Sequence, residues 1–154
     1  MKEKLVKTLI ERKLTISCCE SLSAGLCMAT LASVPGASQV LKGGFVTYQT
    51  QMKEDLVHVD KKIIEQYGVV SKECAHDMAL HTKELTQSDI ALSFTGNAGP
   101  SAMENKPAGL VYCALAYKDR VDVFEFQLKM ERNQLRETIV DLMIERVIAL
   151  LEME

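Results

Sequence analysis

The sequence predicts a three-layer α/β/α sandwich built on a mixed β-sheet. Short apolar segments typical of buried strands alternate with amphipathic helical segments along most of the chain, as expected for parallel strands joined by helices. Two segments of alternating apolar residues then flank Lys118–Arg120, which predicts an antiparallel hairpin in the same sheet. A chain of 154 residues fits one domain, so we expect residues 1–154 to form a single unit.

The first part of the chain is expected to start the sheet. Residues 2–13 place apolar side chains near helical spacing, and residues 14–19 have the short, apolar and partly β-branched character of a buried strand. Ser23 is positioned to cap a helix that runs to Ser33. Residues 40–49 predict a strand, in which a glycine pair indicates a bulge or a close backbone approach.

The rest of the chain supplies three further helices, one strand, the hairpin and a long terminal helix. These elements are expected at 50–57, from the Asp60 cap to Gly68, from Ser71 to Leu85, at 89–95, at 109–117 with 121–129, and at 132–151. The terminal helix has apolar residues on or near one face, namely Leu135, Ile139, Leu142, Val147 and Leu150. That face could serve an interface in a homo-oligomer, or it could cover the sheet.

Composition narrows the classes of function. The apolar fraction is 47%, the formal net charge is −3, and no stretch gathers five or six like charges. A nucleic-acid-binding surface is therefore not expected, because it needs a basic stripe. The apolar runs fall short of the roughly 20 residues of a membrane-spanning helix, and Met1 leads directly into a charged segment rather than a secretory signal. We expect a cytoplasmic protein without membrane contact.

The cysteines and histidines do not form a metal-binding pattern. The chain has five cysteines, an odd number without a C-x-x-C pair, and we expect them to be reduced core residues. His76 and His81 are five positions apart rather than the four that align two ligands on a helix. Neither a metal nor a cofactor is expected.

The first of three chemically rich loops is Glu20–Gly25, where a buried strand turns into a helix. A ligand at such a point meets free backbone N–H groups and the positive end of the helix dipole. Ser21 or Ser23 could present a hydroxyl to a pocket there, or simply cap the helix.

The other two loops are Gly43–Tyr48, with Lys53 five residues beyond the tyrosine, and Thr95–Pro100. A lysine acts as a general base only where burial or a neighbouring cation lowers its pKa, so Lys53 is either a catalytic base or a surface residue. The small residues of Thr95–Pro100 would let a ligand approach the backbone closely, or form no more than a tight turn.

Taken together and in order, these loops resemble the CinA C-terminal domain family. The resemblance rests on five motifs: E-S-x-S/T-x-G, G-G-F-V-T-Y with a lysine five residues on, G-V-V-S, T-G-x-A-G-P and K-P-x-G. They fall on Glu20–Gly25, Gly43–Tyr48 with Lys53, Gly68–Ser71, Thr95–Pro100 and Lys106–Gly109. Longer members carry a further N-terminal domain, and this chain resembles the stand-alone form.

The resemblance implies a metal-free amidase that converts nicotinamide mononucleotide to nicotinic acid mononucleotide and ammonia. The serine, tyrosine and lysine of the family fall on Ser21, Tyr48 and Lys53. Ser21 would attack the carboxamide, neutral Lys53 would carry the proton, and Tyr48 would orient either group. The residues expected to bind the nucleotide are Ser23, Ala24, Gly25, Gly43, Gly44, Thr95, Gly96, Ala98, Gly99, Arg132 and Arg136. Among them, the N–H groups of residues 23–25 would stabilise the oxyanion, and the two arginines would reach the phosphate.

Three segments depart from the motifs of the family. Ala24 stands where glycine is usual, Asn97 stands where isoleucine or valine is usual, and Ser101–Asn105 lacks the usual glycines. These departures leave a second hypothesis open, in which the chain is a catalytically degenerate module that binds a nucleotide or a competence-related partner.

Overall fold

A five-stranded mixed sheet forms the middle layer of the protein, in the strand order β2–β1–β3–β4–β5. The computed structural model describes residues 1–154, with β1 at Ile16–Glu20, β2 at Leu41–Val46, β3 at Ile90–Gly96, β4 at Leu110–Tyr117 and β5 at Arg120–Gln127. Strand β1 runs parallel to β2 and β3, whereas β4 is antiparallel to both β3 and β5. The predicted mixed sheet with a terminal hairpin is therefore confirmed.

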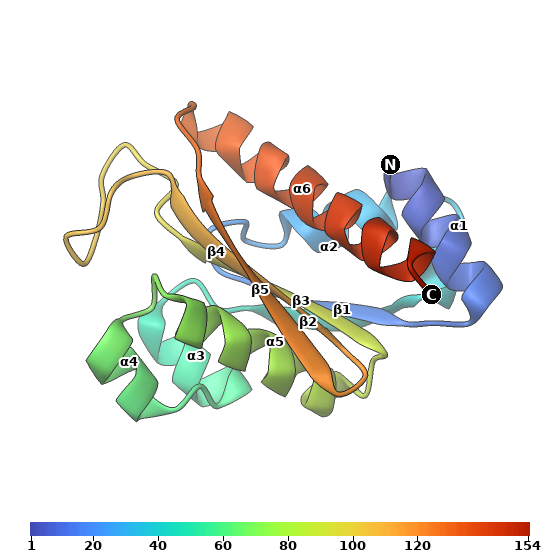
Figure 1. Ribbon diagram of the computed structural model, residues 1–154, viewed down its shortest axis with the longest axis horizontal. Helices are drawn as coiled ribbons and strands as arrows, with labels where there is room; N and C mark the ends of the chain where they lie inside the picture. The colour runs from blue at the N-terminus through green and yellow to red at the C-terminus, as the bar shows by residue number, and fades with distance from the viewer.

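Helices cover both faces of the sheet (Figure 1). One face carries α1 (Lys2–Arg12), α2 (Leu26–Ala32) and α6 (Arg132–Glu152), and a 3-10 turn at Ala37–Gln39 follows α2. The opposite face carries α3 (Thr50–Val57), α4 (Lys61–Tyr67) and α5 (Lys72–Thr86). This is the predicted three-layer α/β/α arrangement.

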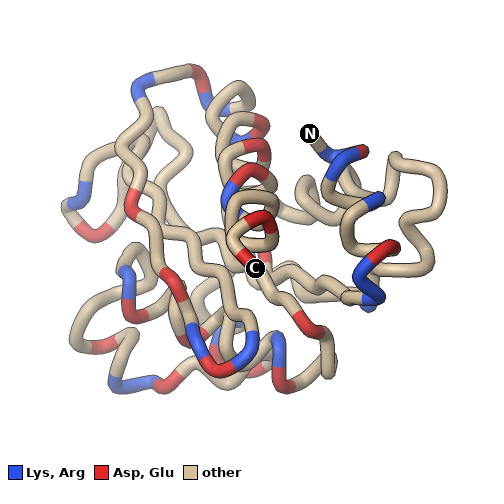
Figure 2. The backbone as a smooth tube through the Cα atoms, turned by 45° about the vertical axis from the view of Figure 1, so that its right-hand side comes forward, with Lys and Arg blue, Asp and Glu red and all other residues tan.

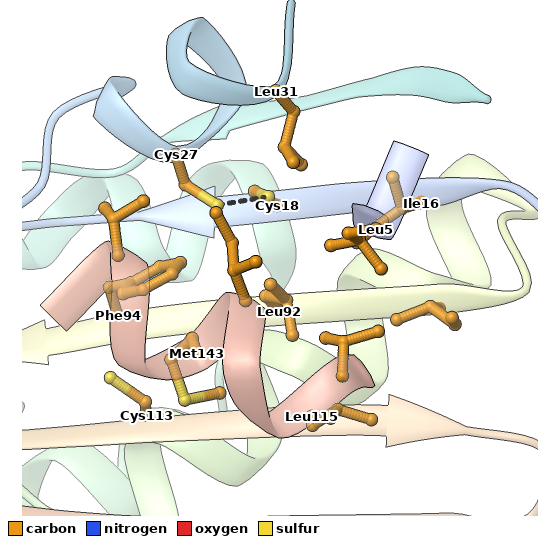
Figure 3. Packing of buried hydrophobic residues seen from close by; sticks show 14 of the residues in the cluster. Leu5, Ile16, Cys18, Cys27, Leu31, Leu92, Phe94, Cys113, Leu115 and Met143 are labelled. Carbon is orange, nitrogen blue, oxygen red and sulfur yellow. Dashed lines mark hydrogen bonds between the residues drawn. The ribbon is translucent and has the colours of Figure 1, made fainter. Parts of the chain in front are cut away.

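The larger hydrophobic core lies between the sheet and α1, α2 and α6 (Figure 3). It includes Cys18 on β1 and Cys27 on α2, whose sulfur atoms are 3.6 Å apart and share a thiol hydrogen bond. All five cysteines are free and buried, which confirms that they serve as small core residues.

The opposite face of the sheet is packed more closely. Alanines on α5, β3 and β4 form one cluster: Ala75, Ala79, Ala91, Ala114 and Ala116. Their small side chains let the helix lie near the sheet. A neighbouring cluster contains Cys19 of β1, Val57 of α3 and Cys74 of α5, and it fixes α3 against the core.

Helix α6 covers the sheet with a broader apolar face than predicted. Its buried residues are Leu135, Ile139, Val140, Met143, Ile144, Val147, Ile148 and Leu151. Leu142 and Leu150, predicted on or near this face, are half-buried and pack against the core beside them. Of the two roles left open for this helix, the structure shows that it covers the sheet.

Charged residues of both signs are interspersed along the chain (Figure 2). None of the helices is both long enough and apolar enough to span a bilayer.

Candidate functional site

A pocket of about 290 Å³ opens beyond the carboxyl ends of β1 and β3. In open α/β sheets, ligands bind in the crevice outside the carboxyl ends of the strands. The lining comprises Ser21, Leu22, Tyr48, Gly96, Asn97, Ala98, Gly99, Ser101, Ala102, Met103 and Arg132. Segments far apart in the sequence therefore meet at one site, and the sheet topology brings them together.

The side chains of Ser21 and Lys53 meet beneath this pocket. Lys53 is the fourth residue of α3, is only 1% exposed, and lies with its Nζ 3.0 Å from the Ser21 Oγ. The amine also donates to the carbonyl of Thr47 at 2.7 Å and to that of Tyr48 at 3.5 Å. The alternative that Lys53 is an ordinary surface lysine is excluded by this burial.

Burial lowers the pKa of Lys53, because removing water penalises the ammonium form. Cys74, Cys19 and Glu104 oppose this effect by Coulomb attraction, but the net direction is downward. No carboxylate forms an ion pair with Lys53. A buried amine with no counter-ion and a serine hydroxyl within reach has the arrangement of a general base beside a nucleophile.

The turn that carries Ser21 differs from the prediction. Ser23 does not cap α2, because Ala24 (φ 48°) and Gly25 (φ 95°) both adopt left-handed conformations and the helix begins only at Leu26. Gly25 occupies the cap position and provides no side-chain hydrogen bond.

The buried carboxylate of Glu20 replaces the missing cap. It accepts the N–H groups of Cys27 at 2.8 Å and Met28 at 3.1 Å. The positive end of α2 therefore already has an anion, and it is not available to a ligand. This interaction also fixes the residue that precedes Ser21.

The N–H groups expected to stabilise an oxyanion are only partly available. That of Ala24 donates to the Ser21 carbonyl at 3.0 Å, whereas those of Leu22, Ser23 and Gly25 donate to no protein atom. Leu22 lines the pocket, but Ser23, Ala24 and Gly25 do not. The hydroxyl of Ser23 is buried and has no hydrogen-bond partner.

Tyr48 does not orient Ser21 or Lys53 through its phenol, contrary to the prediction. Its ring is 53% exposed at the pocket, and its hydroxyl accepts a hydrogen bond from Arg132 at 2.9 Å. Only its backbone carbonyl faces the other two residues, at 3.5 Å from each.

The two arginines of α6 have separate targets. Arg132 lines the pocket and donates to the Gly99 carbonyl at 2.8 Å. Arg136, one helical turn further, donates its Nε to the Leu22 carbonyl at 2.9 Å and its Nη2 to the Ser23 carbonyl at 3.0 Å. Arg136, which was predicted to reach the phosphate, therefore lies outside the pocket lining, and its guanidinium fastens the turn that follows Ser21.

Three further predicted contacts lie outside the pocket. Gly43 and Gly44 belong to β2, where the pairing with β1 shifts at Ile16/Ser17, and a Cβ on Gly44 would lie 2.2 Å from the Cys18 carbonyl oxygen. The expectation of a bulge or a close approach is confirmed, but these glycines serve the sheet. Thr95 is buried and donates its hydroxyl to the Val69 carbonyl at 2.8 Å.

The loop after β3 supplies the remaining predicted contacts and several that were missed. Gly96, Ala98 and Gly99 line the pocket, and the N–H groups of Ala98 and Gly99 donate to no protein atom. The residues that were not predicted as contacts are Leu22, Asn97, Ser101, Ala102 and Met103. The one available signal for most of them was the departure of Asn97 and Ser101–Asn105 from the family motif.

Comparison with known proteins gives a consistent result. The family model described as the CinA C-terminal domain matches residues 1–151. A putative competence-damage inducible protein of Listeria welshimeri is 41% identical over 139 residues, which cover 90% of this chain and 34% of that protein. The chain thus spans about a third of the length of that relative.

Solved structures show the same fold. The competence/damage inducible protein CihA from Agrobacterium tumefaciens is 31% identical, with a TM-score of 0.89 over 97% of this chain and 94% of that chain. A CinA superfamily protein from Escherichia coli is 24% identical and superimposes with a TM-score of 0.93 over 97% of this chain and 90% of that chain.

Proposed function

This chain belongs to the CinA C-terminal domain family, and from that membership and the geometry of the pocket we propose that it is an amidohydrolase. Its proposed substrate is nicotinamide mononucleotide, which it would convert to nicotinic acid mononucleotide and ammonia. The observation that carries the proposal is the buried Lys53 amine, 3.0 Å from a serine hydroxyl that lines a pocket.

In the first half of the proposed reaction, the Ser21 oxygen forms a bond to the carboxamide carbon. The neutral Lys53 amine, held by the Thr47 carbonyl, takes the hydroxyl proton. The amide oxygen becomes an oxyanion, for which the unused N–H groups of Leu22 and Ser23 are the nearest backbone donors in sequence. The intermediate collapses when Lys53 returns the proton to nitrogen: the C–N bond breaks, ammonia leaves, and the acyl group remains on Ser21 as an ester.

In the second half, water attacks the ester carbon while Lys53 takes a proton from it. Collapse of this intermediate breaks the bond to Ser21, which regains its proton from Lys53. The acid is released and the dyad returns to its starting state. One buried amine can serve both halves, because burial lowers its pKa and so favours the neutral form that accepts a proton.

The phosphate of the substrate has candidate donors at the other side of the pocket. Arg132 is the one cationic residue in the lining, and the N–H groups of Ala98 and Gly99 are free. An arginine with backbone N–H groups is a common way to bind phosphate. These donors suit an anionic nucleotide better than a neutral amide.

The departures from the family motif do not favour the alternative of a degenerate module. Ala24 is exposed and lies outside the pocket lining, and the Asn97 side chain is directed to the backbone of its own loop. Ala24 contacts Ser21 only through its backbone N–H, and the Asn97 side chain makes no hydrogen bond to Ser21 or Lys53, so neither departure alters the side chains of the proposed dyad.

Ammonia release from nicotinamide mononucleotide tests the proposal. The native protein should release ammonia, and both Ser21→Ala and Lys53→Ala should fall to background. Ser101→Ala, which changes another serine of the lining that shares no hydrogen bond with Lys53, is the matched control and should retain activity. Thermal-shift measurements should show that Ser21→Ala still binds the nucleotide. Stabilisation of the native protein by many nucleotides, without ammonia, would instead identify a binding module.

A further inference from the structure

The Ser101–Met103 segment of the pocket lining leads into a tight turn with an unusual sequence. In Met103–Lys106, the Lys106 N–H donates to the Met103 carbonyl at 3.2 Å. Both central residues are left-handed, with φ values of 61° for Glu104 and 55° for Asn105. Such a type I′ turn normally contains asparagine and glycine, so the glutamate carries strain. Strain of this kind persists only where the surroundings hold the backbone in place, and it concentrates at functional sites.

Two side chains of the turn fasten it to the segment between α4 and α5. The carboxylate of Glu104 accepts the N–H groups of Val69 at 2.8 Å and Val70 at 3.0 Å. Lys106 donates to the carbonyl of Val70 and pairs with Glu104. Gly68 leaves room for this arrangement, because a Cβ there would lie 2.5 Å from the Glu104 carboxylate.

A third set of contacts to this turn comes from Asn97, the first residue after β3. The buried side-chain amide of Asn97 donates to the Met103 carbonyl at 3.3 Å and accepts the Met103 N–H at 3.3 Å. It also donates to the Lys106 carbonyl at 3.2 Å. Asn97 therefore forms hydrogen bonds with both the N–H and the carbonyl of Met103, which neither isoleucine nor valine could do.

The residue held by these contacts is a large, exposed apolar residue of the pocket lining. Met103 is 49% exposed although it lines the pocket, and Tyr48 is the other large apolar side chain of the lining that is equally open. A thioether makes favourable contacts with aromatic rings and adapts to their shape. The pocket therefore offers a planar ring two soft, apolar contacts, and Ser21 and Arg132 provide its polar ones.

We propose that Met103 is a specificity-determining residue that contacts the aromatic ring of the substrate, and that Asn97 is the positioning residue that holds it there. This inference rests on the proposed function. Because Met103 makes no hydrogen bond to Ser21 or Lys53, it selects the substrate without taking part in the proton transfers.

Steady-state kinetics with nicotinamide mononucleotide test the inference. Met103→Ala should raise KM about tenfold and leave kcat within about twofold, because the lost contact is made equally in the ground and transition states. Met103→Leu, which keeps the volume, should restore KM to within about threefold of the native value. The exposed Met153→Ala at the chain end is the control and should change neither constant.

The role of Asn97 is tested by a double-mutant cycle. Asn97→Val should raise KM in the same direction as Met103→Ala, and the double variant should show no further increase, because Asn97 acts through Met103. Additive effects would show that Asn97 supports the fold only. A thermal melt of each variant establishes that it is folded.

The outcomes separate this inference from the proposed function. Turnover by the native protein with an unchanged KM in Met103→Ala would overturn the inference alone. If the native protein binds nicotinamide mononucleotide without releasing ammonia, the amidase fails, and a tenfold weaker Kd for Met103→Ala in calorimetry would still support the contact. A native protein that neither binds nor hydrolyses this nucleotide would overturn both.

Discussion

Two lysines near the pocket, Lys53 and Lys106, differ in burial and in whether a carboxylate lies beside them. Lys53 lies under the nucleophile, 1% exposed, with carbonyl and hydroxyl oxygens as its only partners and no carboxylate beside it. Lys106, on the facing loop, pairs with Glu104 and remains partly open to solvent. The first arrangement destabilises the ammonium and produces a base, whereas the second keeps a charged pair that fastens a loop. Under the proposed function, the first lysine would serve the chemistry and the second would support the residues that select the substrate.

Removal of the buried Lys53 amine should have the largest effect on activity. Lys53→Met replaces the amine with an apolar side chain of similar length. It should lower kcat by about 10³-fold or more, because it removes the base that activates Ser21. The free energy of unfolding should change little, because relief of the desolvation of the buried amine offsets the loss of its hydrogen bonds to the Ser21 hydroxyl and the Thr47 carbonyl. Kinetics together with a denaturant melt check both expectations, and a large loss of stability would show that Lys53 has a structural role.

Substitution of Arg136 should disturb the turn that follows Ser21 without changing a residue of the pocket lining. Arg136→Met releases the carbonyls of Leu22 and Ser23, so the turn after Ser21 loses its fixed position. Misplacement by about 1 Å can reduce a rate 10²-fold, and we expect a loss of this size in kcat with little change in KM.

The neighbouring arginine provides the matched comparison. Arg132→Met should raise KM about tenfold and leave kcat nearly unchanged, because it removes a phosphate donor rather than a support for the nucleophile. If both variants changed the same constant, the assignment of the two arginines to separate tasks would be wrong.

The pH dependence should follow the dyad. Because the pKa of Lys53 is lowered in the folded protein, the neutral amine accumulates as pH rises through that pKa. Below it, kcat/KM should increase about tenfold per pH unit. The unfolded chain holds the Lys53 proton up to about pH 10.4, so the contribution of this residue to stability also improves with rising pH between the folded and unfolded pKa values. Met103→Leu should keep the native profile, and a flat profile would argue against an amine base.

Local signals were enough to predict much of the fold. Ser71 caps α5 and accepts the Cys74 N–H, and Asp60 caps α4 and accepts the Lys62 N–H, as their positions suggested. Ser23 follows the same local rule, but the left-handed pair Ala24 and Gly25 delays the helix, and no cap preference reveals that geometry.

The arrangement of the candidate site depends on contacts between residues far apart in the sequence, which local sequence patterns do not predict. Lys53 and Ser21 are 32 positions apart, and Arg136 reaches a carbonyl 114 positions away. The identity of the dyad came from the family motifs, which require both residues. The burial of Lys53 and the task of Arg136 followed only from the packing of α3 and α6 on the sheet, and so did the place of Met103 in the wall.

The smallest expected effect concerns backbone strain, which is present both at Ala24 and at Glu104. Ala24 beside the nucleophile adopts a φ of 48°, a region that costs an alanine roughly 1–2 kcal/mol. Glycine removes that cost but gives the unfolded chain more freedom, worth about 0.4–1 kcal/mol. Ala24→Gly should therefore raise the free energy of unfolding by about 0.8 kcal/mol, the difference between the midpoints of these terms.

An alanine-to-glycine substitution within α2 should change the free energy of unfolding in the opposite direction. Ala29 is exposed in the middle of that helix, and Ala29→Gly should lower the free energy of unfolding by about 1 kcal/mol. Urea melts of the two variants measure the contrast. Equal destabilisation would show that the left-handed conformation at Ala24 carries no strain, and that the turn after Ser21 is held in place by Glu20 and Arg136 without opposition from its own backbone. The predicted contrast would instead show that these two side chains hold the nucleophile turn in a conformation that its sequence alone disfavours.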